Sequence, residues 1–131
     1  MIRVLDASAL LAYLNKESGH AIVKDALANA AETDRPLLMN TVNWGEVFYI
    51  LIRAVGLKEA ENTLQIIDTF PLEIVPATQE LAMQAALYKS RGILSYADAF
   101  AAALARLKKA ELLTSDHDFK AVERDIKIIW I

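Results

Sequence analysis

Five short apolar runs alternate with longer helical patterns along the chain, and this alternation restricts the folds that the chain can adopt. The runs cover residues 2–5, 36–40, 72–76, 111–115 and 126–131. Apolar residues at helical spacing fill most of the intervals between them, over residues 8–16, 19–32, 41–56, 57–70, 77–92 and 95–110. Strands that are joined through helices pair in parallel and are covered on both faces. The sequence therefore predicts an α/β three-layer sandwich with a mainly parallel central β-sheet flanked by helices.

Composition narrows the class of protein. The 131 residues are expected to form one domain, residues 1–131, which is large enough to bury a core. The chain has no cysteine and a formal net charge of −3, which argues against disulfides, thiolate metal sites and a generally basic nucleic-acid binder. No signal-peptide pattern opens it, and no apolar window reaches the ~20 residues that a membrane span requires. We therefore expect a soluble, cytoplasmic protein.

Four acidic residues follow the predicted strands directly or lie within the first turns of the next helix: Asp6, Glu46, Asp98 and Asp116. Each also has a purely structural interpretation. Asp6 suits a helix N-cap and Asp116 an Asx-turn. Three pairs have the spacing of a capping box, namely Asn43 with Glu46, Ser95 with Asp98, and Ser115 with Asp118.

The four acids together indicate more than caps, because all of them are predicted at one edge of one sheet. Ligands bind at the carboxyl ends of the strands in open α/β sheets. The small residues Ala97, Ala101, Ala102 and Ala105 would let the helix that carries Asp98 lie close to the sheet. Converging carboxylates repel one another unless they are protonated or bind a cation. Hard divalent ions such as Mg²⁺ or Mn²⁺ suit oxygen ligands and assist displacement at phosphorus, so the pattern predicts metal-dependent phosphodiester hydrolysis.

The four acids also lie in four blocks that occur in the order and at the separations of a known family. The blocks read VLDASALLAYL, TVNWGEVFYIL, SYADAFAAALA and LLTSDHDF, beginning at residues 4, 41, 95 and 112. They resemble the blocks of PIN-domain ribonucleases and are most similar to those of the VapC-type toxins of toxin–antitoxin pairs. The resemblance covers essentially the whole chain. It implies supporting roles for Ser8, Asn43 and Thr114, and a packing role for Phe119.

The resemblance implies a Mg²⁺- or Mn²⁺-dependent endoribonuclease that cleaves single-stranded or loop RNA, forms a homodimer and is inhibited by a cognate antitoxin protein. In this hypothesis Asp6, Asp98 and Asp116 bind the metal ion directly or through water. Glu46 positions or activates the attacking water. Asp118 is the alternative to Asp116 as the fourth acid and otherwise has a supporting role.

Three basic residues lie near these blocks. Lys89 and Arg91 precede the helix that carries Asp98 and could contact RNA phosphates, although a solvated helix end is the simpler interpretation. His117 lies between two aspartates, but its predicted place on a loop favours a ring that points to solvent over a direct role.

Other functions fit parts of the sequence. A phospho-acceptor hydrolase would need a second acid two residues after Asp6, where the chain has Ser8. A catalytically inactive RNA- or protein-binding module of the same fold is expected to lack one or more of the four acids, and all are present. A housekeeping RNA-processing nuclease of the same family stays open as an alternative to a toxin.

The predicted helices over residues 41–56 and 57–70 carry more apolar residues than one core-facing stripe normally needs. The surplus would suit a groove for an antitoxin helix or a dimer face. The residues concerned are Trp44, Phe48, Tyr49, Leu51, Ile52, Leu64, Ile66 and Ile67.

Overall fold

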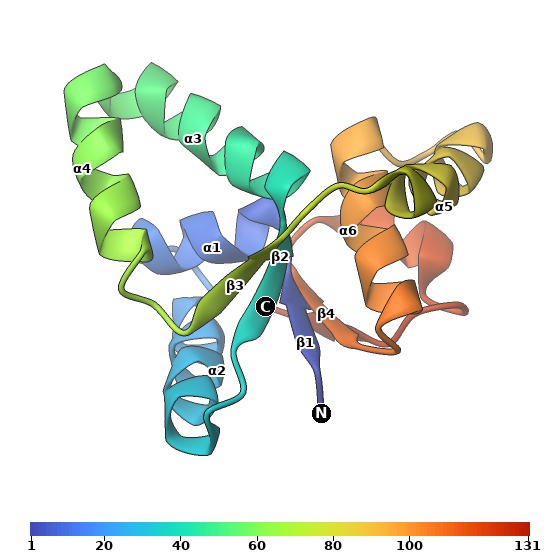
Figure 1. The fold of residues 1–131 in the computed structure, drawn as a ribbon, viewed down its shortest axis with the longest axis horizontal. Helices are drawn as coiled ribbons and strands as arrows, with labels where there is room; N and C mark the ends of the chain where they lie inside the picture. The colour runs from blue at the N-terminus through green and yellow to red at the C-terminus, as the bar shows by residue number, and fades with distance from the viewer.

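A five-stranded, all-parallel β-sheet forms the centre of the computed structural model, which describes residues 1–131 (Figure 1). The strands are β1 (Arg3–Leu5), β2 (Leu37–Asn40), β3 (Leu72–Val75), β4 (Glu111–Thr114) and β5 (Ile128–Trp130). Their order across the sheet is β3-β2-β1-β4-β5, and every neighbouring pair is parallel. Each apolar run in the sequence forms one of these strands, so the predicted parallel sheet is confirmed.

Helices cover both faces of the sheet, as the sequence predicted (Figure 1). They are α1 (Ala7–Leu14), α2 (His20–Thr33), α3 (Thr41–Val55), α4 (Leu57–Ile67), α5 (Gln79–Ser90) and α6 (Tyr96–Leu107), with a short 3₁₀-helix η1 (His117–Val122) before β5. Alternate strand residues point to opposite faces. One hydrophobic core joins Val4, Leu38 and Leu112 to α5, α6 and η1. The other joins Leu5, Met39 and Leu113 to α1, α2, α3 and α4. None of the helices is long and apolar enough to cross a membrane.

The strand order places a switch point at the centre of the sheet. From β1 the chain moves outward through β2 and β3, and it then returns to the other side of β1 as β4 and β5. The connections therefore leave β1 and β4 in opposite directions, and open α/β sheets bind ligands beyond the carboxyl ends of the strands at such a point. Leu5 and Leu113 lie opposite each other near those ends, so the residues that follow them in the chain emerge side by side.

For two of the three expected capping pairs, a different residue caps the helix in the structure. The side chain of Asn40, not that of Asn43, caps α3 by accepting a hydrogen bond from Val42 N, because the helix begins directly after β2. Asp116, not Ser115, caps η1. The expected caps at Asp6, which accepts from Ala9 N, and at Ser95, which accepts from Asp98 N, are both present.

Candidate functional site

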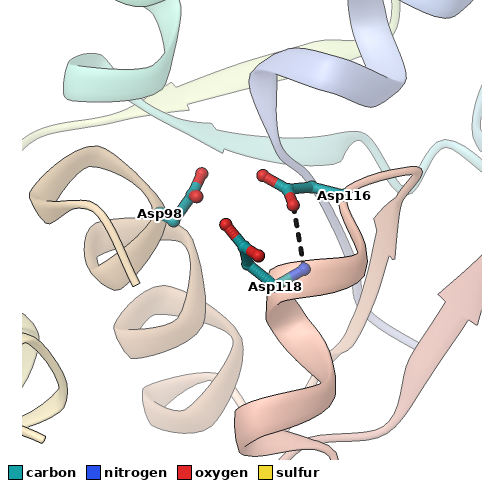
Figure 2. Close-up of side chains that lie close together, drawn as sticks. All are labelled: Asp98, Asp116 and Asp118. Atoms are coloured by element: carbon teal, nitrogen blue, oxygen red, sulfur yellow. Dashed lines mark hydrogen bonds between the residues drawn. The ribbon is translucent and has the colours of Figure 1, made fainter. Parts of the chain in front are cut away.

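Three carboxylates meet at the carboxyl edge of the sheet. Asp98 lies in the first turn of α6, Asp116 lies between β4 and η1, and Asp118 lies in the first turn of η1. Figure 2 shows their carboxylate groups pointing toward a common space. One oxygen atom of each residue lies within 4.8 Å of the others. We refer to Asp98, Asp116 and Asp118 as the acidic cluster.

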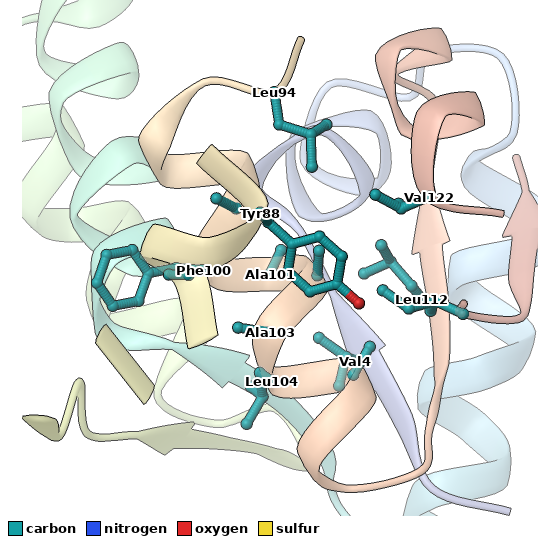
Figure 3. Close-up of a cluster of buried hydrophobic side chains, with 14 of the residues drawn as sticks. Val4, Tyr88, Leu94, Phe100, Ala101, Ala103, Leu104, Leu112 and Val122 are labelled. Atoms are coloured by element: carbon teal, nitrogen blue, oxygen red, sulfur yellow. The ribbon is translucent and has the colours of Figure 1, made fainter. Parts of the chain in front are cut away.

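The close approach of α6 to the sheet explains how Asp98 reaches this edge. Residues 99–105 of α6 are all buried, and five of the seven are alanines. Figure 3 shows Ala101 and Ala103 packed among the larger side chains of the core beside β1 and β4. At the start of the helix, the buried Asn43 of α3 donates a hydrogen bond from Nδ2 to the Ala97 carbonyl at 3.0 Å. Asn43 therefore holds the turn of α6 that carries Asp98.

The turn after β4 is held by hydrogen bonds that fix both of its aspartates. Asp116 Oδ1 accepts a hydrogen bond from Asp118 N at 2.9 Å (Figure 2). Asp116 N in turn donates to Thr114 Oγ1 at 3.0 Å. The fully buried Phe119 anchors the following residues in the core. The Asx-turn expected at Asp116 thus exists, and it is part of the cluster rather than an alternative to it.

Asp6 lies just behind the cluster and is almost completely buried. Ser8 Oγ donates to its two carboxylate oxygens at 2.8 and 2.9 Å. Thr114 Oγ1 donates to Oδ2 at 2.5 Å, and Ala9 N donates to Oδ1 at 2.9 Å. Both oxygens of Asp6 are therefore occupied by donors of the chain itself. Thr114 contacts both Asp6 and Asp116 and links the two acids.

Burial and mutual repulsion disfavour negative charge at this edge. Burial raises the pKa of Asp6 to about 6, although its hydrogen bonds oppose the rise. Burial, followed by the charges of Asp116 and Asp6, raises the pKa of Asp98 to about 7. Burial and the charge of Asp116 also raise the pKa of Glu46, which lies half-buried on α3. All four predicted acids therefore lie close enough for their charges to interact.

A hard divalent cation fits this set of residues. The cluster offers only carboxylate oxygens, which Mg²⁺ and Mn²⁺ prefer. Burial and the charges of Asp116 and Asp6 raise the pKa of Asp98, and a bound cation would offset this repulsion between carboxylates. In addition, the buried Oδ1 of Asn43, on the side chain that bonds to Ala97, accepts no hydrogen bond. It can accept one from a water molecule of a hydrated ion.

The two basic residues that the sequence suggested as contacts for RNA phosphates bind other residues of the chain instead. Lys89 Nζ donates to the Leu94 carbonyl at 3.0 Å. The Arg91 guanidinium pairs with Asp125 at 3.1 Å and lies over the ring of Tyr88. Both therefore stabilise the end of α5 and its surroundings.

The apolar surplus of α3 and α4 divides between core and surface. Leu51 and Ile67 are buried, whereas Tyr49 and Ile66 are exposed. The remaining members, Trp44, Phe48, Ile52 and Leu64, are partly buried against the core. A second group of exposed apolar side chains, which the sequence did not single out, comprises Met83, Leu87 and Ile93 on and after α5.

A sizeable cavity lies away from the acidic cluster. Its volume is about 710 Å³, and its lining includes Arg3, Leu37 and Glu73 at the amino ends of β1, β2 and β3. It contains none of the predicted acids, so its size does not mark it as the reactive site.

Sequence reasoning missed one aromatic contact beside the cluster. The ring of His117, which is exposed as expected, stacks on Trp130 with centroids 5.7 Å apart. No pattern in the sequence indicated this contact, because it depends on the register of β5 against β4, which places Trp130 opposite Thr114.

Comparisons with known proteins agree with this architecture. Residues 3–125 match the PIN domain family model. No curated protein matches the chain. Among solved structures, a chain of VapBC2 from Rickettsia felis bound to a promoter DNA fragment is similar with a TM-score of 0.75 and 17% identity, covering 98% of each chain. DNA-bound VapBC from Salmonella typhimurium gives 0.75 and 14%, covering 98% of this chain and 97% of the other. VapC20 of Mycobacterium tuberculosis, a toxin that cleaves the sarcin-ricin loop, gives 0.69 and 21%, covering 92% and 94%.

Proposed function

Since the chain belongs to the PIN domain family, we propose that it is an endoribonuclease that hydrolyses RNA phosphodiester bonds with the help of Mg²⁺ or Mn²⁺. The observation that carries this proposal is the meeting of Asp98, Asp116 and Asp118, with oxygens within 4.8 Å, at the ligand-binding edge of the sheet. The likeness in fold to VapC20, which cleaves an RNA loop, supports RNA as the substrate.

The residues divide into ligands and supporting groups. Asp98, Asp116 and Asp118 would hold the ion directly, because their oxygens share one small space. Asp6 would contribute its charge through a bridging water, since hydroxyl and N–H donors already occupy both of its oxygens. Ser8 and Thr114 would keep that carboxylate oriented. When bound, a divalent ion would lower the pKa of a water molecule that it binds. It would also offset the negative charge that develops on the phosphate oxygens.

Glu46 would accept the proton of the attacking water. Burial raises the pKa of its carboxyl, and a base is most effective when its pKa approaches the working pH. Glu46 is not among the three acids whose oxygens lie within 4.8 Å of one another, so it need not act as a ligand. Asn43, one turn earlier, would hold α6 and therefore Asp98 in place through its bond to Ala97.

We further propose that the protein is the toxin of a toxin–antitoxin module and forms a homodimer. The likeness to chains of VapBC complexes supports an antitoxin partner. The exposed apolar residues Tyr49 and Ile66, with Met83 and Leu87, offer surface for such contacts. Expression of the wild type, but not of Asp98→Asn, should then arrest growth, whereas a housekeeping nuclease should be tolerated. The mass in solution, measured by light scattering, tests the dimer.

The central test is cleavage of a mixed pool of cellular RNA by purified protein with Mn²⁺, Mg²⁺ or a chelator. Cuts at defined sites should disappear with the chelator and with Asp98→Asn. They should persist with Asp25→Asn, which removes an exposed carboxylate from α2. Activity retained by Asp98→Asn would refute the assignment.

Metal binding can be followed without any substrate. The chain has only two histidines, and His117 lies between two cluster aspartates. Paramagnetic Mn²⁺ should therefore broaden the imidazole proton resonances of His117 at lower concentration than those of His20. Equal broadening of both histidines would argue against an ion in the acidic cluster.

A further inference from the structure

His117, which is exposed, and Trp130, which is partly buried, form an aromatic pair beside the acidic cluster. Their ring centroids are 5.7 Å apart and their planes are inclined by only 20°. His117 directly follows Asp116 in the chain, and Trp130 lies opposite Thr114 across the β4–β5 pair. The pair therefore stands at the same edge of the sheet as the three carboxylates.

The turn that carries His117 does not depend on this ring for its conformation. The Asp116 side chain accepts from Asp118 N at 2.9 Å, and its carbonyl accepts from Phe119 N at 3.2 Å. The buried Phe119 fixes the turn to the core. Trp130 packs partly against the same core cluster. The imidazole of His117 thus rests on the Trp130 ring. It adds a flat aromatic surface that the turn does not need for its conformation.

The two basic residues that the sequence suggested as RNA contacts are already engaged within the chain. Lys89 and Arg91 already bond to Leu94 and Asp125. The cluster itself is negative and repels phosphates in the absence of a cation. The face of an aromatic ring offers a stacking contact that does not require an ion pair with the phosphates. Unpaired bases stack on histidine and tryptophan rings, because every base has a π face.

We propose that His117, backed by Trp130, is a stacking subsite for one unpaired nucleobase of single-stranded RNA. The inference rests on the proposed nuclease function and extends it, because the subsite would order the nucleotide next to the scissile bond. Such ordering places the phosphodiester at the acids and raises the rate by positioning. A stacking contact also tolerates several bases, so it would position the substrate more than it would specify the sequence.

Proton NMR of the two histidines tests the subsite directly. We would add a short oligoadenylate to Asp98→Asn protein in Mg²⁺, and compare it with an abasic ribose-phosphate oligomer of the same length. The imidazole C–H resonances of His117 should move upfield with the oligoadenylate only. Those of His20, which begins α2 on the other face of the sheet, should not move. His117 resonances that stay in place at millimolar oligoadenylate would overturn the proposal.

Two substitutions separate stacking from a structural role. His117→Ala should weaken oligoadenylate binding about tenfold, which is within the range for the loss of one base–aromatic stack. His117→Phe, which keeps a flat ring, should bind within about twofold of the parent. Affinity for the abasic oligomer should be the same in all three proteins. Equal loss of binding in the Ala and Phe variants would show that the ring does not act by stacking.

The outcomes also separate this subsite from the nuclease function. If the wild type cuts RNA but His117→Ala cuts it with unchanged kcat/KM and the resonances do not shift, the subsite alone fails. If the wild type cuts no RNA while the His117 resonances still shift, the subsite stands and the nuclease proposal fails.

Discussion

Replacement of Asp98 by Asn is expected to stabilise the metal-free protein at the same time as it abolishes cleavage. The carboxylate of Asp98 is half-buried and lies near the charges of Asp116, Asp6 and Glu46. The amide has nearly the same shape, and Ser95 Oγ can still cap the backbone at residue 98. The substitution therefore removes an unfavourable charge and little else.

The magnitude follows from the pKa of this group. Burial and neighbouring charges raise the pKa of Asp98 from 3.8 to about 7, which at about 1.4 kcal/mol per pKa unit corresponds to about 4 kcal/mol for ionisation in the folded state. Because the side chain is also partly exposed, water screens much of this energy, and we expect a gain of about 1–2 kcal/mol. For a domain of this size the melting temperature should rise by about 4–8 °C.

The effect must depend on pH in a defined direction. The pKa is raised in the folded state, so the folded protein retains a proton that the unfolded chain releases between pH 3.8 and about 7. Wild-type stability therefore falls as the pH rises through this window, and the advantage of the Asn variant should be small at its acid end and complete above it.

Urea or thermal unfolding, followed by circular dichroism in a chelator at about pH 5 and about pH 8, measures this difference. With Mn²⁺ at about 100 times its Kd the wild type should gain about 2.7 kcal/mol, and Asp98→Asn should gain less. Asp25→Asn, at an exposed site on α2, serves as the matched control. An Asn variant that is less stable than the wild type at the higher pH in chelator would refute the electrostatic reasoning.

Three further substitutions test the contacts that hold the sheet and its helices together. Thr114→Val should cost about 2 kcal/mol, because it removes the hydroxyl that donates to buried Asp6; urea unfolding should show the loss, and Thr114→Ser should largely restore it. Lys127 lowers the pKa of Glu111 from 4.5, so Glu111→Gln should cost about 1–2 kcal/mol near neutral pH and progressively less as the pH falls through the lowered pKa; a loss independent of pH would contradict this. Ala102→Leu should cost about 1–3 kcal/mol by pushing α6 away from the sheet, and unchanged thermal stability would show that this interface has free space.

The location of the site could be predicted because it follows from topology. Parallel strands end at one edge, and the residues after β1 and β4 must emerge there whatever the details of the helices. The alanines of α6 carried a similar signal, because only a helix with small side chains can lie so near a sheet. Asp6 and Asp116 were therefore within reach of sequence reasoning.

The division of roles at that edge could not be predicted, because it depends on single hydrogen bonds. Asp118 joins Asp98 and Asp116 only because its backbone N–H bonds to the Asp116 side chain. Hydrogen bonds from Ser8 and from Thr114, which is far away in the sequence, hold Asp6 behind these three residues. Spacing patterns also fitted Asn43 as a cap, whereas the shorter connection after β2 makes it an interior residue of α3.

The aromatic pair escaped prediction for a related reason. A stack between residues on η1 and β5 requires the register of β5 against β4. No local pattern in a three-residue edge strand defines that register. Successive strand residues point to opposite faces of the sheet, but this rule places Trp130 beside His117 only once the pairing of β5 with β4 is known.

The pairing of β1 with β4 also determines when the proposed site can form during synthesis of the chain. Asp6 and Thr114, which hold the two sides of the site together, are 108 positions apart in the chain. A nascent chain on the ribosome carries Asp6 from the beginning but has no β4 to complete the edge of the sheet, and contacts of such long range form late in folding. A nascent chain that has not yet reached Thr114 therefore lacks one side of the proposed site. The proposed activity can begin only after β4 has been made and has paired with β1.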